Sequence, residues 1–202
     1  ITSDTIVRVS AVTNDSFKLA KDSDGFYLIN NKNDLLYFSA AVNNGATKLN
    51  ARMTNDIDLE YELDDFNNWN PIGSYSTHST HHGMDEVFTD TTSYEGIFDG
   101  AGHSISNLYI SSNPCNYKNA VLFLSIKNAT VKNLVLKNSY LGSEKETALI
   151  GHAENSTIVN CGTEANFIAI TNSDIAAICG SAWNCKIENC YNIGNIMDDR
   201  RE

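Results

Sequence analysis

Three histidines are the side chains of this sequence best suited to bind a metal ion. His78, His81 and His82 fall close together in a polar segment, and neutral imidazole is a common metal ligand. The segment gives them no rigid carrier, and the His-Glu-x-x-His motif of zinc peptidases occurs nowhere in the sequence. We therefore interpret the cluster as part of a solvated loop and keep metal binding as the alternative.

Alternating carboxylates form a second candidate site. In a strand, Asp56, Asp58 and Glu60 would point to the same face, and carboxylate oxygens are ligands that Ca²⁺ prefers. An enzyme that used such a cation would also need a nearby base, and Arg52 and Lys48 precede the acids on the same face. The alternatives are a cation site at Asp56 and Asp58 and a solvated strand face that binds nothing.

The cysteines are a third group with chemical potential. The sequence contains five of them, at Cys115, Cys161, Cys179, Cys185 and Cys190. Their spacing lacks the two-residue separation of paired zinc ligands, so we interpret them as small buried apolar side chains. A disulfide between Cys161 and Cys190 stays open, because these two residues occupy equivalent places in a repeat.

That repeat consists of two phrases that keep step with each other. The first phrase is an aliphatic residue, any residue, Asn, then Leu or Cys, and it occurs at Ile105–Leu108, Val131–Leu134, Ile158–Cys161 and Ile187–Cys190. Its asparagines are 26, 27 and 29 residues apart. The second phrase is an apolar run at residues 122–125, 149–151 and 178–180. Periods of this length are typical of repeat architectures.

Each repeat has the composition of short strands joined by turns. Runs rich in Ile, Val and Leu alternate with Gly, Asn and Ser, and no repeat sustains the three-and-four spacing of an amphipathic helix. Three short strands and three turns fill roughly 20 to 30 residues. The sequence therefore predicts an all-β fold, a right-handed parallel β-helix in which each repeat is one coil.

Stacked coils are expected to bring equivalent side chains into ladders about 4.8 Å apart. Asn suits the bends between strands because it tolerates a left-handed backbone. The predicted ladders are Ile105/Val131/Ile158/Ile187, Leu108/Leu134/Cys161/Cys190, Phe123/Ile150/Cys179 and the amide ladder Asn107/Asn133/Asn160/Asn189. These residues are expected to hold the fold together rather than to perform chemistry.

One helix is expected before the coils, at about residues 34–44. Leu35, Phe38 and Val42 share its apolar face, and Asn33 or Asp34 can cap its start. The open end of a β-helix exposes apolar side chains and strand edges, so we expect the helix to cover that end. The chain then divides into lead-in strands at 1–24, a cap with the first coil at 25–60, and coils at 61–202 with an inserted loop at about 74–93.

Composition excludes several partners. A net charge of −11 is opposite to the basic stripe that nucleic acids require, and no apolar run approaches the roughly 20 residues of a membrane span. No P-loop, full dinucleotide glycine motif or nucleophile elbow occurs, so we expect no cofactor. The chain begins at Ile1, and we expect it to be part of a longer protein.

The order of several phrases resembles the GLUG-repeat family. Those phrases are Asp56–Leu59, Trp69–Gly73, Gly96–His103, Ile105–Leu108 and the aliphatic-x-Asn-Leu/Cys repeats that follow. The usual Gly-Leu-Phe-Gly phrase has changed to Val121–Ser125, Ala148–Gly151 and Ala177–Gly180, which leaves the subfamily open. The family comprises right-handed β-helix regions of bacterial secreted and surface-anchored proteins, including adhesins and the non-catalytic part of immunoglobulin A-cleaving peptidases. The resemblance implies an exported bacterial protein, outside the cell or on its surface.

The expected function is that of a non-enzymatic adhesive or spacer module that binds a glycan or a host or surface protein. Candidate exposed aromatic residues for stacking on sugars are Tyr94, Tyr109, Tyr117, Tyr140, Trp183 and Tyr191. The alternative is a polysaccharide lyase or glycoside hydrolase of β-helix type that uses the region of Asp56 and Asp58. A groove with clustered acid and base groups would favour the enzyme.

Overall fold

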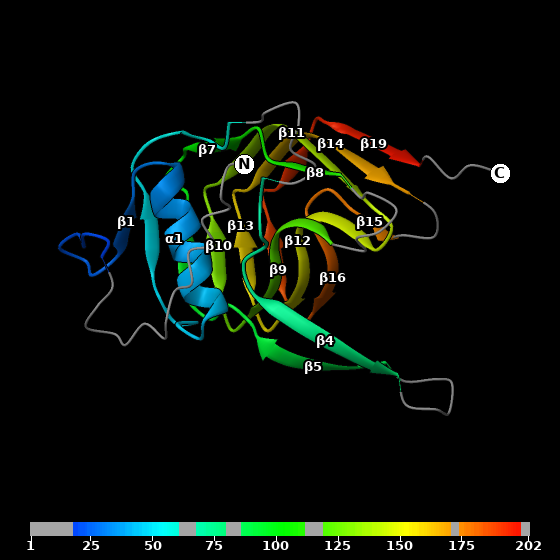
Figure 1. Ribbon diagram of the computed structural model, residues 1–202, viewed down its shortest axis with the longest axis horizontal. Coiled ribbons are helices and arrows are strands. Elements are labelled where there is room, and N and C mark those ends of the chain that lie inside the picture. The colour runs from blue at the N-terminus through cyan, green and yellow to red at the C-terminus, as the bar shows by residue number, and fades with distance from the viewer. Residues whose placement is uncertain (1–17, 61–67, 80–85, 112–118, 171–173, 199–202) are drawn as a thin grey trace, which may run out of the picture.

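Three parallel sheets form most of the protein (Figure 1), and the computed structural model describes residues 18–60, 68–79, 86–111, 119–170 and 174–198. The first sheet contains, in spatial order, β1 (Tyr27–Ile29), β2 (Ala51–Met53), β6 (Ile97–Asp99), β10 (Thr130–Lys132), β13 (Thr157–Val159) and β17 (Lys186–Glu188). The second contains β3 (Ile57–Asp58), β7 (Ser104–Ser106), β8 (Tyr109–Ser111), β11 (Val135–Ser143), β14 (Gly162–Ala169), β18 (Tyr191–Asn192) and β19 (Asn195–Asp198). The third contains β9 (Ala120–Lys127), β12 (Glu146–Glu154), β15 (Asp174–Ile175) and β16 (Cys179–Trp183).

Neighbouring strands of each sheet come from successive repeats and run parallel. The chain therefore visits the three sheets in turn and begins the next coil one strand further along the axis. This arrangement is a parallel β-helix with one helix among its described residues, and it confirms the predicted fold class.

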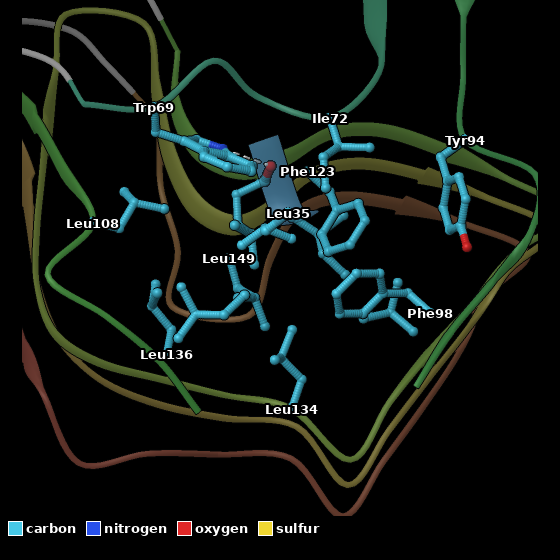
Figure 2. Packing of buried hydrophobic residues seen from close by; sticks show 14 of the residues in the cluster. Leu35, Trp69, Ile72, Tyr94, Phe98, Leu108, Phe123, Leu134, Leu136 and Leu149 are labelled. Carbon is cyan, nitrogen blue, oxygen red and sulfur yellow. Dashed lines mark hydrogen bonds between the residues drawn. The ribbon is translucent and has the colours of Figure 1, made fainter. Parts of the chain in front are cut away.

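The core fills the space inside the coils. In Figure 2 the ribbons of successive coils follow nearly the same outline, and apolar side chains project inward from all sides. Phe98 and Phe123 pack edge to face with ring centroids 5.3 Å apart. Tyr94, expected at the surface, is fully buried beside Phe123, and its hydroxyl donates to the carbonyl oxygen of Leu49 at 2.8 Å. Each buried side chain of this size contributes about 1.5–3 kcal/mol to the stability of the fold.

Helix α1 (Lys32–Asn43) connects β1 to β2 and closes the first coil. Its N-cap is Asn31, whose side chain accepts from the backbone N–H of Asp34, so the helix begins two residues earlier than predicted. Phe38 packs against the rings of Tyr94 and Phe98 at 5.7 and 5.6 Å. Leu35 reaches the middle of the same core (Figure 2). The helix therefore covers the apolar interior at the N-terminal end of the coils.

An antiparallel hairpin interrupts the third side of one coil. It consists of β4 (Ser74–Ser79) and β5 (Glu86–Thr92) and extends away from the coils (Figure 1). Ile72 and Tyr94, which flank it, form parallel bridges to residues of β9. The backbone turns outward at Gly73, where φ is +83° and a Cβ would lie 2.5 Å from the carbonyl oxygen of Ser125. The segment expected as a loop at about 74–93 is thus a paired hairpin inserted into a strand of the third sheet.

The register of the first sheet corrects one predicted apolar ladder. Val131 pairs with Phe98 on one side and with Ile158 on the other. Ile105 lies in the second sheet, where it pairs with Leu136. The prediction that Ile105 stacks on Val131 is therefore wrong, and Phe98 takes that rung. The ladder Phe123/Ile150/Cys179 has the predicted register.

The same shift separates Leu108 from Leu134 and Asn107 from Asn133. Figure 2 places Leu108 and Leu134 on different sides of the core, and the side chain of Asn107 donates to Asp58 instead of joining the ladder of Asn133. The reason is that asparagines with positive φ occur at several corners of a coil. They are Asn107, Asn128, Asn133, Asn138, Asn155, Asn160, Asn184 and Asn189. An aliphatic-x-Asn phrase thus marks a bend without saying which bend it is.

Candidate functional site

The carboxylates singled out from the sequence line a small groove at the N-terminal end of the coils. The groove has a volume of about 310 Å³ and lies between the start of α1 and β3. It is lined by Asn30, Asn31, Lys32, Asn33, Asp56, Ile57, Asp58 and Glu60. The structure thus brings the predicted acids together with amides and with one lysine, which the sequence analysis did not include.

Asp58 is held by hydrogen bonds from its own coil and from the next one. Its Oδ1 accepts from the backbone N–H of Glu60 at 2.8 Å and from Asn107 Nδ2 at 2.7 Å. The first bond stabilises a bend in which Glu60 has a φ of +53°. Glu60 in turn lies 3.3 Å from the Lys32 amine in an ion pair across the groove. The Asp58 carboxylate therefore connects the bend after β3 to the bend at Asn107 in the next coil.

Asp56 is bound to the following coil in a similar way. Its Oδ1 accepts from the backbone N–H of Ser104 at 2.8 Å and lies 3.4 Å from His103 Nδ1. The backbone hydrogen bond from Ser104 is the main cause that lowers the pKa of the Asp56 carboxyl. The carboxylate form is thus favoured by a bond that also fixes the spacing between two coils.

The two bases expected near these acids lie elsewhere. Arg52 forms ion pairs with Asp22, Asp24 and Asp99 on the outer face of the first sheet, and its guanidinium lies 4.2 Å from the Phe26 ring centroid. The Lys48 amine lies 3.5 Å from Glu95. The expectation that Arg52 and Lys48 converge on Asp56 and Asp58 is therefore wrong. The corner at residue 55 separates β2 from β3, so alternation does not continue across it.

The histidine cluster receives no geometric support as a metal site. His78 lies in β4, where the backbone alone is described, and His81 and His82 fall outside the described residues. Within the described parts of the chain, no three His, Cys, Asp or Glu side chains come close enough to hold a metal ion.

Amide ladders at the corners connect the coils along the axis. Asn160 Nδ2 donates to Asn133 Oδ1 at 3.0 Å, and Asn189 Nδ2 donates to Asn160 Oδ1 at 3.3 Å. Two further ladders escaped the sequence analysis: Asn184 donates to Asn155 at 2.7 Å and Asn195 donates to Asn166 at 2.8 Å. The 29-residue spacing of both pairs was the signal that could have revealed them.

The cysteines within the described residues are free thiols that lie in the core or pack against it. Cys161 is fully buried, while Cys179, Cys185 and Cys190 are half-buried. Burial raises the pKa of both the Cys161 and the Cys179 thiols to about 12. Cys115 falls outside the described residues. The Cys161 and Cys179 thiols are therefore protonated at neutral pH, and among the described residues the cysteines take part in no group of three side chains that could hold a metal ion.

The outer face of the second sheet carries a column of aromatic and amide side chains. Tyr109 and Tyr140 pair in register and stack with ring centroids 5.1 Å apart. The column continues through Asn166 and Asn195 on the next two coils. All four side chains are at least partly exposed. We call this set, Tyr109, Tyr140, Asn166 and Asn195, the Tyr–Asn column.

The architecture by itself assigns no activity, because one fold supports many functions. Among the described residues, no helix is long and apolar enough to cross a membrane. The chain was compared with protein-family models, with curated proteins and with solved structures, and none of the three comparisons gives a match.

Proposed function

We propose that this chain is a non-enzymatic β-helix module of an exported bacterial cell-surface protein, of the GLUG-repeat type, which acts as an adhesive or spacer region and binds a glycan or a protein. The observation that carries the proposal is the use made of the acids. Asp56 accepts from Ser104, Asp58 from Asn107 and Asp99 from Asn133, and each bond joins one coil to the next. This structural use of the three carboxylates supports a non-enzymatic module.

The many bonds between successive coils support a spacer or adhesive role. Backbone ladders, amide ladders and cross-coil ion pairs all run along the axis, including the pair between Lys127 and Glu154 at 2.8 Å. A solenoid whose repeats contact their neighbours in this way presents a long, continuous surface. Such a surface can hold an extended ligand at several points at once.

The Tyr–Asn column supplies a surface suited to a glycan. Phenol and amide groups donate and accept hydrogen bonds, and the stacked rings of Tyr109 and Tyr140 are followed in register by Asn166 and Asn195 on the next two strands. Sugar hydroxyls offer both donors and acceptors, so a chain of sugar units lying along the axis would meet a polar group at each coil. We therefore place the proposed glycan contact on this column.

The test is to incubate the protein with immobilised neutral and acidic polysaccharides while recording both retention and the release of unsaturated or reducing sugars. We expect retention without release. Tyr140→Ala and Asn166→Ala should each weaken retention, whereas Tyr37→Ala on helix α1 should leave it unchanged. Release of sugars that stops in Asp58→Asn would instead identify a lyase or hydrolase at the groove and would refute the non-enzymatic proposal.

A further inference from the structure

A cavity of about 680 Å³ lies between the segment that leads into β1 and the loop that joins α1 to β2, at the end of the molecule where Figure 1 shows these elements. Among the described residues that line it are two lysines, Lys21 and Lys48, and no aspartate or glutamate. We propose that this cavity, which we call the lysine pocket, binds an acidic sugar unit through the carboxylate of that sugar. The inference deepens the proposed function, because it names the chemical class of one part of the glycan that the module binds.

Lys21 brings to the pocket a positive charge that no acid compensates. Its amine lies 4.3 Å from the centroid of the Tyr27 ring, and the face of an aromatic ring attracts a cation. Among the described residues, no carboxylate lies within ion-pair distance of this amine. The ring therefore holds the lysine at the wall of the pocket and leaves its charge available to an anionic ligand.

Lys48 is held by an ion pair that a ligand can replace. Its amine lies 3.5 Å from Glu95 Oε2, but its side chain is 78% exposed, and exposed ion pairs contribute little to stability. Glu95 has a second donor as well, because Thr47 Oγ1 donates to its Oε1 at 3.2 Å. The carboxylate of a ligand can therefore compete with Glu95 for the Lys48 amine.

The other polar groups of the pocket suit the hydroxyls of a sugar. Thr47 and Asn50 line it beside the lysines, and hydroxyl and amide groups both donate and accept hydrogen bonds. Asn50 Oδ1 accepts from the backbone N–H of Ile97 at 2.9 Å, which fixes the orientation of the amide. The volume lies within the range of roughly 300–1,000 Å³ that is usual for small-molecule sites. The pocket thus offers more space and more donors than a bare inorganic anion needs.

Both walls of the lysine pocket are held in place by the rest of the fold. On one side, Arg52 pairs with Asp22 and Asp24 of the turn before β1. These pairs also compensate the two carboxylates that lie nearest to Lys21 in the sequence. On the other side, the backbone N–H of Glu95 donates to the carbonyl oxygen of Thr47 at 2.8 Å. Walls that are already ordered lower the entropic cost of binding a ligand.

The acidity of the chain as a whole determines which probe tests the pocket. The net charge is −11, so a long acidic polymer would be repelled by much of the surface. At physiological salt, charges further away than about 8 Å are largely screened, and a short acidic ligand senses mainly the two lysines. The probe is therefore a galacturonic acid tetramer, and a neutral galactose tetramer is its control. Binding of each to the full chain is measured by isothermal titration calorimetry.

We expect the acidic tetramer to bind and the neutral tetramer to bind at least about tenfold more weakly. Lys21→Gln and Lys48→Gln should each weaken binding of the acidic tetramer about fivefold, which is near the upper limit for a partly exposed ion pair. Lys48→Arg keeps the charge and should keep most of the affinity. Lys137→Gln removes the same charge from the outer face of β11 and should have no effect. Circular dichroism checks the fold of each variant.

Glu95→Gln gives a test of opposite sign. It removes the carboxylate that competes for the Lys48 amine and keeps an oxygen that can accept from Thr47. Binding of the acidic tetramer should therefore become stronger, by about threefold. Weaker binding in this variant would mean that Glu95 itself contacts the ligand, and the assignment of an anion site would then be wrong.

A wild-type chain that does not bind the acidic tetramer at millimolar concentration, or lysine variants that bind it as tightly as the wild type, would overturn the inference. The retention test of the adhesive function has a separate readout, because it depends on Tyr140 of the Tyr–Asn column. Retention that Tyr140→Ala weakens, without tetramer binding, would refute the lysine pocket alone. Tetramer binding that needs the two lysines, without retention on any polysaccharide, would refute the adhesive function alone.

Discussion

Asn133 Nδ2 lies 3.0 Å from Asp99 Oδ1, so the ladder of Asn133, Asn160 and Asn189 begins on a carboxylate. The same oxygen accepts from the backbone N–H of Ala101, and Lys132 lies 3.4 Å from Oδ2. Burial by itself raises the pKa of the Asp99 carboxyl, but these hydrogen bonds and the lysine outweigh it and hold the pKa below the usual value. A charged acceptor at this place polarises the first amide of the ladder and stabilises the corner.

Asp99→Asn should therefore lower the free energy of unfolding at neutral pH by about 1–3 kcal/mol, since hydrogen bonds to a charged group are lost. Because the folded pKa lies below the unfolded value of about 3.9, the contribution of Asp99 is complete above that pH. It disappears as the pH falls through the folded pKa. Urea titrations from pH 7 to pH 2 should show a shallower acid limb for the variant. Asp174→Asn, on an exposed strand end, serves as the control, and an equal change in both variants would contradict the assignment.

Asn160 allows the amide ladder to be separated from the backbone bend. Its φ is +54°, and it both donates to Asn133 and accepts from Asn189. Asn160→Gly keeps the left-handed bend and removes the amide, whereas Asn160→Ala also adds about 1–2 kcal/mol of backbone strain. We expect the order of stability in chemical denaturation to be Asn, then Gly, then Ala. Equal stability of the Gly and Ala variants would show that the left-handed backbone at residue 160 does not limit which residues are tolerated there.

The repeat in the sequence was sufficient to predict the coils, because periodic apolar residues determine which faces are buried whatever the details of each bend. It was not sufficient to predict the register of the first full coil. The phrases Ile105–Leu108 and Val131–Leu134 contain the same left-handed turn, but they lie at different corners of their coils. The true partner of Val131 is Phe98, which the phrase could not reveal because Gly100 stands where the other repeats have asparagine.

The candidate site was predictable in its members but not in its geometry. Alternation along a strand places Asp56 and Asp58 near one another, and both line the groove. The helix N-terminus that supplies Lys32 comes from a separate part of the chain, so local spacing carried no sign of it. The pairing of β4 with β5 was missed because β4, Ser74–Ser79, is polar at nearly every position, which resembles a loop.

The cap formed by helix α1 predicts a large effect from one aromatic residue. Phe38 is fully buried and contacts the rings of Tyr94 and Phe98, so Phe38→Ala should cost about 3–5 kcal/mol. Asn33→Ala on the exposed face of the helix should change stability by less than about 0.5 kcal/mol. Chemical denaturation measures both values. A small effect of Phe38→Ala would mean that the helix does not seal the coils.

Two neighbouring residues at the bend between β10 and β11 test the direction of the side chains. Leu134 is fully buried, whereas Val135 next to it is partly exposed. Leu134→Ala should lower the free energy of unfolding by about 2–5 kcal/mol because it leaves a cavity. Val135→Ala should cost about 1 kcal/mol or less, since its side chain can be replaced by water. The reverse order in urea titrations would mean that this strand has the opposite face inward.

The thiols should react with alkylating reagents in an order set by how deeply each side chain is buried. Cys161 is fully buried and its pKa is raised to about 12, so at pH 8 only about one molecule in ten thousand carries the reactive thiolate. The Cys185 side chain is partly exposed, so a small reagent reaches it without unfolding of the chain. Iodoacetamide labelling followed by peptide mass spectrometry should therefore modify Cys185 well before Cys161 in the native protein, and both equally in denaturant. Native labelling of Cys161 as fast as Cys185 would show that the coil above it opens readily, and the stacked core described for this end of the molecule would then be wrong.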